Sequence, residues 1–142
     1  MAKTLAKRAF RYRFYPSETQ ERELLRTFGC VRLVYNKALD ARKTAWCTEQ
    51  RHVNYAETST LLTSWKNTDE LAFLKEVPSV PLQQTLRHLQ KAFTAFWEKR
   101  ANYPRFKSRK RGHASAEYTR SAFRYRNGQL WPAKMIEPLA VA

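Results

Sequence analysis

The sequence predicts an α+β fold, in which a helical middle is flanked by an N-terminal strand and a C-terminal β-hairpin. Residues 6–15 alternate between two faces, and apolar residues between positions 17 and 97 recur every three or four positions. Asn127-Gly128, a strong signal for a two-residue hairpin turn, separates two short segments of strand-like composition. At 142 residues, the chain is long enough for one domain with its own core.

The N-terminal strand is predicted from residues 6–15, AKRAFRYRFY, before Pro16 ends it. Period-two alternation with aromatic enrichment is typical of a strand with one buried and one basic face. The tetrapeptide Phe-Arg-Tyr-Arg occurs at 10–13 and again at 123–126. We interpret the two copies as strands of one small β-unit that share a basic face.

The first helical region has Ser17 as its N-cap, and Gln20 is the expected capping-box partner. Gly29 predicts a turn or kink, and a second helical pattern then continues to Trp46. Two helices around Gly29 could form a helix-turn-helix over residues 17–46, although most helical hairpins bind nothing.

Two further helices are expected, over 54–66 with Asn54 as cap and from Ser79, as cap, to Trp97, with Pro81 in its first turn. The predicted organisation is therefore a strand in 1–16, a helical part in 17–100, and a basic connector with a hairpin in 101–142. In the hairpin, Pro132 limits the returning strand. The closing residues MIEPLAVA carry no informative pattern.

The net charge of +15 is concentrated in two distant segments. Residues 1–15 hold five basic residues and no acid, and residues 99–126 hold ten basic residues against one acid, whereas the chain between them is almost neutral. A basic excess of this kind, interleaved with aromatic residues, predicts a surface that binds nucleic acid. For either segment alone, a solubilising charged loop would be an equal explanation.

The sequence gives little support for an enzyme or a metal site. His52, His88 and His113 are widely separated, and none has a cysteine or carboxylate at metal-ligand spacing. No phosphate-cradling glycine loop is present, and Cys30 and Cys47 fit neither zinc nor disulfide spacing. Without an apolar run of membrane-spanning length or a secretion signal, we expect a cytoplasmic protein with no membrane partner and no cofactor.

Four segments resemble the N-terminal part of the TnpB (OrfB) proteins encoded by bacterial insertion sequences. They are FRYRFYPSETQERELLRTFGCVRLVYNKAL at 10–39, LKEVPSVPLQQTLRHLQKAFTAFW at 74–97, YPRFKSRKRG at 103–112 and LWPAK at 130–134. They follow in order and with sensible spacing over nearly the whole chain.

The resemblance implies a wedge-type β-barrel interrupted by a helical recognition lobe, here small and incomplete. It also implies two partners, a transposon-derived guide RNA and the DNA beside the target. The RNA-guided nuclease domain of the family, with its Mg²⁺-binding carboxylates and zinc-binding cysteines, lies beyond the matching part, so we expect no catalysis from this chain. Because the resemblance stops before the barrel is complete, we also expect a truncated product of poor solubility.

The resemblance also implies binding roles for individual positions. Four polar residues match family positions that face the target-adjacent duplex: Tyr55, Ser79, Gln83 and Thr119. The Gln83 amide could pair with adenine there. Cations expected to contact phosphates are Arg11, Arg13, Arg32, Arg105, Lys107, Arg109, Lys110 and Arg111, with Arg124 and Arg126 added by the predicted basic face of the hairpin.

Two alternatives stay open: a DNA-binding transposition factor that uses 17–46 as a helix-turn-helix, and a basic RNA-binding protein such as a ribosome-associated factor. The sequence specifies no oligomeric state.

Overall fold

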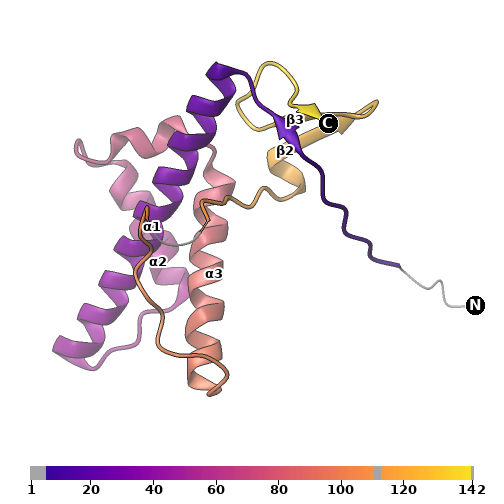
Figure 1. Cartoon of the computed structure of the whole chain (residues 1–142). Coiled ribbons are helices and arrows are strands. Elements are labelled where there is room, and N and C mark those ends of the chain that lie inside the picture. The colour runs from indigo at the N-terminus through magenta and orange to yellow at the C-terminus, as the bar shows by residue number, and fades with distance from the viewer. Residues whose placement is uncertain (1–5, 111–112, 142) are drawn as a thin grey trace, which may run out of the picture.

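A single long helix, α1 (Glu18–Glu49), determines the arrangement of the molecule. The computed structural model describes residues 6–110 and 113–141. α2 (Tyr55–Lys66) and α3 (Ser79–Trp97) pack beside α1, and the short 3-10 helix η1 (Ala72–Glu76) connects them. A small β-unit lies next to the N-terminal end of α1, and the α+β class is therefore as predicted (Figure 1).

α1 is continuous through Gly29, so the predicted turn or kink at this residue, and with it a helix-turn-helix centred there, is wrong. The predicted capping box does start the helix, with Ser17 N donating to Gln20 Oε1 at 2.9 Å and Gln20 N donating to Ser17 Oγ at 3.2 Å. Beyond Gly29, the buried residues Val34 and Leu39 belong to the hydrophobic core. Their burial outweighs the cost of about 1 kcal/mol that glycine imposes on a helix interior.

The core lies mainly between α1 and α3, with contributions from α2 and η1. The predicted α3 stripe is confirmed, since Leu82, Leu86, Leu89 and Phe93 are buried, although Phe96 remains 37% exposed. Leu62 of α2 and Leu74 of η1 complete the core, as does the small thiol side chain of Cys30.

The predicted caps of α2 and α3 have different outcomes. Asn54 caps α2 as predicted, because its side chain accepts a hydrogen bond from Glu57 N at 2.9 Å. Ser79 does not cap α3: it is the first helical residue, and Pro78 occupies the N-cap position without a side-chain cap.

The C-terminal hairpin forms as predicted, from β2 (Phe123–Arg126) and β3 (Gln129–Pro132). Asn127 has φ of 53° and Gly128 has φ of 75°, and two left-handed residues are the requirement of a type I′ turn. The 3-10 helix η2 (Arg120–Ala122) precedes the hairpin directly.

The N-terminal strand is much shorter than predicted. β1 contains only Phe14–Tyr15, and residues 6–13 are exposed and form no strand. β1 pairs with β4 (Ala140–Val141) and not with the hairpin, so the closing residues, which looked uninformative, supply its only partner strand among the described residues. Residues 6–13 have no such partner, and a strand without a neighbour leaves its backbone groups unpaired.

The β-unit consists of two two-stranded sheets that are joined by an isolated bridge, in which Leu139 N donates to Leu130 O at 2.9 Å. The described strands do not close into a barrel. Gln20 attaches this unit to the bundle by donating to the carbonyl oxygens of Glu137 and Pro138, both at 3.1 Å. Lys134 Nζ adds a bond to Lys75 O at 2.7 Å.

We expect Gly29→Ala to stabilise the protein by about 0.5–1 kcal/mol, because alanine is the better helix former. A Cβ built at Gly29 meets nothing within 4 Å, and the residue lies inside a regular helix. Urea unfolding followed by circular dichroism measures the change.

Gly128→Ala is the matched control, because Gly128 has a positive φ of 75° that alanine adopts only at a cost of about 1–2 kcal/mol. The control should lower the free energy of unfolding. Destabilisation by Gly29→Ala would contradict a continuous α1.

Candidate nucleic-acid interface

Two of the predicted duplex-facing residues, Tyr55 and Gln83, are in direct contact. Gln83 Nε2 donates to Tyr55 Oη at 2.6 Å and to Ser59 Oγ at 2.7 Å. The guanidinium carbon of Arg87 lies 4.7 Å from the centre of the Tyr55 ring. We call Tyr55, Ser59, Gln83 and Arg87 the amide cluster; the exposed Ser79 lies one helical turn before Gln83 on α3.

The hydrogen bonds of Gln83 limit how it could read a base. A bidentate contact with adenine needs the amide oxygen as acceptor and one N–H as donor. Within the described part of the chain, the Gln83 oxygen accepts no hydrogen bond, whereas its nitrogen donates to two hydroxyl groups. The amide cluster therefore presents an acceptor, and reading adenine requires Gln83 to release Tyr55 or Ser59.

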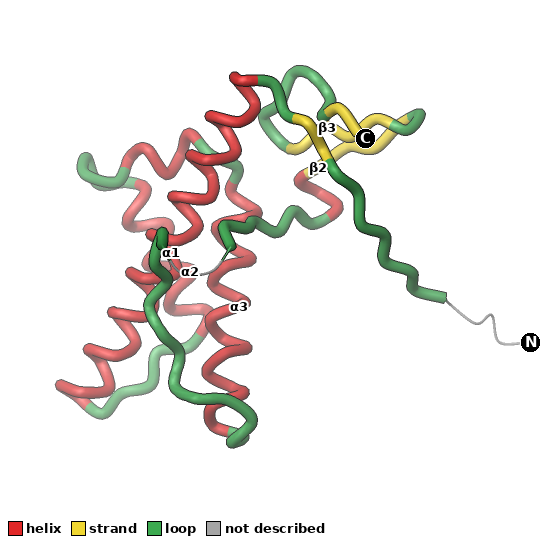
Figure 2. Tube along the Cα trace, in the orientation of Figure 1, coloured by secondary structure: helices red, strands yellow, loops and turns green. Residues whose placement is uncertain are grey.

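Residues 101–110, the first part of the basic connector, run along α1 without secondary structure (Figure 2). Asn36 on α1 binds this segment through both groups of its amide. Its Nδ2 donates to Lys107 O at 2.8 Å, and its Oδ1 accepts from Lys107 N at 2.7 Å. Lys107 Nζ then lies 4.4 Å from the centre of the Tyr35 ring, and burial lowers the pKa of its amine.

The Asn36 contact brings three predicted phosphate-binding residues together. Arg32, Lys107 and Arg109 line one cavity of about 160 Å³ between α1 and the connector. His113 lines it as well, and we call these four residues the connector cluster. Arg105 and Lys110 are exposed on the same segment, and Arg111 lies outside the described residues.

None of the predicted phosphate-binding cations that the structure describes forms an ion pair with another described residue. The arginines that do form such pairs are Arg22, Arg26, Arg51 and Arg100, and each has a glutamate oxygen at 3.5 Å or less. They belong to the near-neutral part of the chain or to its edge. The predicted cations of the connector and hairpin therefore have no acidic partner among the described residues that would compete with an external anion.

The amide cluster and the connector cluster lie on different sides of α3. Gln83 faces α2, whereas Thr85 lines a cavity with Lys107 of the connector. Residues two apart on an α-helix point in roughly opposite directions, since each residue turns the helix by about 100°. The predicted site residues therefore form two surfaces that are separated by α3.

The hairpin cations form a third group. Arg124 lies 4.6 Å from the Trp131 ring centre, and strand alternation places Arg126 on the same face of β2. Phe123 faces the other way and lines an apolar groove together with Arg11. The predicted basic face shared by the two Phe-Arg-Tyr-Arg segments is therefore wrong, and Arg13 is simply exposed in the segment before β1.

Thr119, the fourth predicted duplex-facing residue, precedes η2, and its hydroxyl lies 3.4 Å from that of Ser121. No hydrogen bond in the described ranges joins it to Tyr55, Ser79 or Gln83.

Comparison with known proteins finds one matching family model and two similar curated proteins. A family model described as the helix-turn-helix domain of the OrfB proteins of IS605 elements matches residues 1–51. A protein of Streptomyces pristinaespiralis, whose name describes an RNA-guided DNA endonuclease, is 67% identical over 135 residues, which is 95% of this chain and 34% of the relative. The protein InsQ of Escherichia coli K12, whose name also describes a putative RNA-guided DNA endonuclease, is 38% identical over 120 residues. The match covers 84% of this chain and 28% of the relative.

Over most of its length, the chain is therefore similar to the N-terminal third of proteins of the TnpB (OrfB) family. It spans about a third of the length of the curated relatives it matches. In this chain, the region that matches the helix-turn-helix model contains a continuous α1, and the nearest turn between two helices is the loop after Glu49 that leads to α2.

Neither a metal-binding group of side chains nor a membrane-spanning helix occurs in the described residues. No group of three metal-ligating side chains occurs in 6–110 or 113–141. Across the same ranges, no helix combines the length and apolar character needed to cross a membrane.

Sequence reasoning missed several contacts that build the interface. The sequence predicted only a capping role for Gln20 and no structural role for Asn36, yet each holds a segment far away in sequence. Ser59 and Arg87 were not singled out, although each is four residues from a predicted site residue and therefore on the same helix face.

We expect Asn36→Ala to release the connector from α1. Each lost hydrogen bond contributes about 0.5–1.5 kcal/mol, and Lys107 N loses its acceptor. Amide hydrogen exchange should therefore become faster at Lys107, while the core amides of α3 stay protected.

Asn67→Ala is the control, because the Asn67 side chain forms no hydrogen bond within the described structure. Unchanged exchange at Lys107 in Asn36→Ala would show that the connector is held in another way.

Proposed function

We propose that this chain is the nucleic-acid-binding N-terminal part of a TnpB-like protein, which holds guide RNA and the duplex DNA beside the target. The observation that carries the proposal is the set of cations without acidic partners that Asn36 holds on one side of the bundle. Guanidinium and ammonium groups in such a set suit phosphate oxygens. The RNA and DNA partners are suggested by the printed names of the relatives.

The two surfaces on either side of α3 suggest a division of labour. The connector cluster, with Arg105 and Lys110, would contact the sugar–phosphate backbone of the RNA. The amide cluster has one cation and several neutral hydrogen-bonding groups, which is the composition expected for base edges in a groove. Ser79 and Thr119 would extend this duplex-facing surface, and the hairpin cations would add backbone contacts.

We infer that the chain contributes binding and not cleavage. Its proposed site consists of cations, amides and hydroxyl groups, none of which needs a metal or other cofactor to bind nucleic acid. Any cleavage by the longer relatives would then depend on the two thirds of their length that this chain does not match.

The description of the family model favours a second candidate, a DNA-binding transposition factor of the helix-turn-helix type. In that case the helix after the α1–α2 loop would enter the major groove and the chain would prefer duplex DNA over structured RNA. A general RNA-binding protein would bind any polyanion equally well. A comparison of duplex DNA, structured RNA from the host element and single strands separates the three functions.

The salt dependence of binding tests the phosphate contacts. For duplex DNA, the logarithm of the association constant should fall with the logarithm of salt concentration, with a slope of about −0.9 for each neutralised phosphate. We expect Arg109→Ala and Arg32→Ala each to reduce the steepness of the slope for RNA or DNA by somewhat less than one, as measured by fluorescence anisotropy.

Arg22→Ala is the matched control, because Arg22 is an exposed cation of α1 that already pairs with Glu18 at 3.5 Å. It should leave the slope nearly unchanged. Equal effects of Arg22→Ala and Arg109→Ala would indicate that only the net charge matters.

The amide cluster is tested by the sequence preference of duplex binding. We expect Gln83→Ala to weaken discrimination at one base pair by about 1–3 kcal/mol, as measured by selection from a randomised duplex library, with no change in salt slope. Gln84→Ala is the control on the neighbouring position, which points about 100° away around α3. A uniform loss of affinity for all sequences in Gln83→Ala would place this residue outside the base-reading surface.

A further inference from the structure

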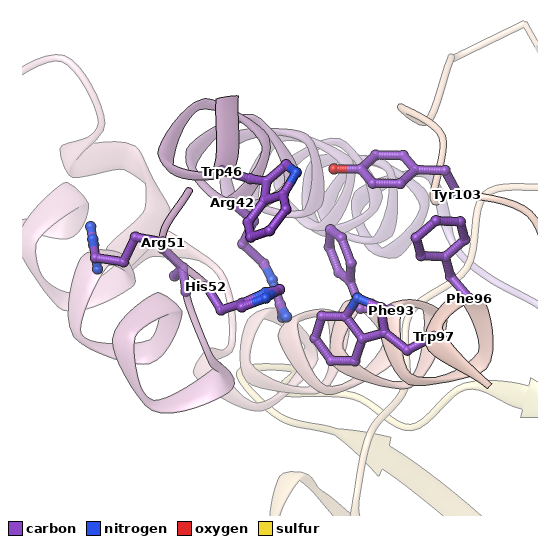
Figure 3. A pocket seen from close by; sticks show the side chains of 9 residues that line it. Arg42, Trp46, Arg51, His52, Phe93, Phe96, Trp97 and Tyr103 are labelled. Carbon is purple, nitrogen blue, oxygen red and sulfur yellow. The ribbon is translucent and has the colours of Figure 1, made fainter. Parts of the chain in front are cut away.

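α1 and α3 both end at the end of the bundle opposite the β-unit (Figure 1). A pocket lined largely by aromatic rings lies there (Figure 3). Its volume is about 280 Å³. Side chains from α1, the loop after it, α3 and the start of the connector enclose it, and we call this set the aromatic pocket: Arg42, Trp46, His52, Phe93, Trp97 and Tyr103.

The rings of the aromatic pocket leave large faces open to solvent. Trp46 is 46% exposed and Trp97 is 47% exposed, and the ring of His52 lies between them, with centroid distances of 4.6 Å and 5.5 Å. Figure 3 shows Trp46 and Tyr103 on one side of the pocket and Trp97 on the other. Burying an aromatic ring is favourable, so rings that stay clustered and exposed have apolar surface left to bury against a partner. Clusters of this kind therefore mark interaction sites.

Arg42 places a positive charge within this aromatic surface. The residue is only 5% exposed, and its guanidinium carbon lies 4.0 Å from the centre of the Phe93 ring. It donates one hydrogen bond to Gln90 Oε1 at 2.8 Å and forms no ion pair with any described residue. Burial lowers the pKa of this guanidinium.

A buried guanidinium with a single side-chain acceptor retains donors that an occupant of the pocket would satisfy. Arginine has five N–H donors, and buried charged groups are normally paired. The two acids that flank the pocket loop, Glu49 and Glu57, are already paired with Arg51, at 3.2 Å and 2.7 Å. The occupant must therefore be flat enough to stack on indole rings and must carry acceptors toward Arg42.

We propose that the aromatic pocket binds one unpaired guanine base of single-stranded RNA. The base would stack on the exposed face of Trp46, with Trp97 at its edge, and its O6 and N7 atoms, the commonest bidentate partners of arginine in nucleic acids, would accept from Arg42. The inference rests on the proposed function, because it takes the guide RNA as the single strand.

The size and charge of the pocket disfavour a larger ligand and a cationic one. Its volume is slightly below the range of about 300–1,000 Å³ that is typical for drug-sized ligands, so it suits one base and not a stacked pair. Arg42, which has no acidic partner among the described residues, disfavours a cationic ligand such as a quaternary ammonium, although aromatic cages otherwise bind such groups. A paired base inside a duplex has no open face that could stack on an aromatic ring of the pocket.

The aromatic pocket is continuous with the connector. Tyr103 lines the pocket, and Lys107, four residues later, belongs to the connector cluster. Four residues of extended chain span about 14 Å at most, which a single strand covers in a few nucleotides. A strand whose base enters the pocket therefore leads its neighbouring phosphates toward Lys107 and Arg109.

Binding of short labelled RNA oligomers to the full chain tests the proposal. The probes carry a central guanine, a central uracil or a central abasic site in an otherwise identical uridine background, and fluorescence anisotropy measures affinity. We expect the guanine probe to bind about tenfold more tightly than the abasic probe, since one base–aromatic stack accounts for a factor of this order. Trp46→Ala should remove the difference.

Phe73→Ala is the matched control, because Phe73 of η1 is also an exposed aromatic residue, at 40%, and lies outside the aromatic pocket. It should keep the guanine advantage. Arg42→Lys should reduce the preference for guanine over uracil; if this buried position fails to fold, Trp46→Ala and Trp97→Ala still decide the outcome.

The results distinguish two kinds of failure. If the wild-type chain shows no salt-dependent binding of any RNA or DNA, the proposed function is wrong. If it binds with a clear salt dependence but has equal affinity for the guanine and abasic probes, only the base site is overturned. Equal binding of guanine and uracil, or tighter binding of the matching DNA oligomer, would overturn the assignment to a guanine of RNA.

Discussion

The packing of α1 against α3 is the interaction on which the other parts of the structure depend. Val34, Ala38, Leu86 and Leu89 are almost completely buried in this contact. Once it forms, the remaining faces of the two helices are fixed in direction. One side receives α2 and the amide cluster, another receives the connector, and the two C-terminal ends enclose the aromatic pocket. The core carries no charge of its own at these positions, so the polar surfaces can differ in chemistry without changing the fold.

The separation of charge in the sequence has a physical counterpart in the pairing of side chains. The middle of the chain balances its own charges, through contacts such as Arg26 with Glu76 and Arg51 with Glu57. The cations of the connector lack such described partners, and their backbone is nevertheless held in place by a neutral amide, Asn36. Positioning by a neutral group keeps the positive potential of the surface intact, whereas an acid in the same role would have cancelled part of it.

Local sequence signals predicted the elements whose formation depends on neighbouring residues. The Ser17–Gln20 capping box, the Asn54 cap, the α3 stripe and the Asn127-Gly128 turn all form as expected, because each involves residues within a few positions of one another. Gly29 misled the prediction, since tertiary burial on both sides carries the helix through it. The extent of β1 was overestimated because alternation reports a preference for strand, not the presence of a partner. The candidate site was predicted as a set of residue types; which of them lie together depends on Asn36 and on the opposite sides of α3, and neither is visible in local patterns.

Gln20 has a consequence for the order in which the molecule assembles. The same amide group that completes the first turn of α1 also binds carbonyl oxygens that are 117 and 118 positions later in the chain. During synthesis on the ribosome, the three helices can therefore pack together before the C-terminal segment that binds Gln20 has been made. Closing so long a loop has a high entropic cost, and contacts between residues far apart in sequence form slowly. The pairing of β1 with β4 is therefore expected to form last. A nascent chain would thus possess its bundle, and the clefts between its helices, before its two ends meet.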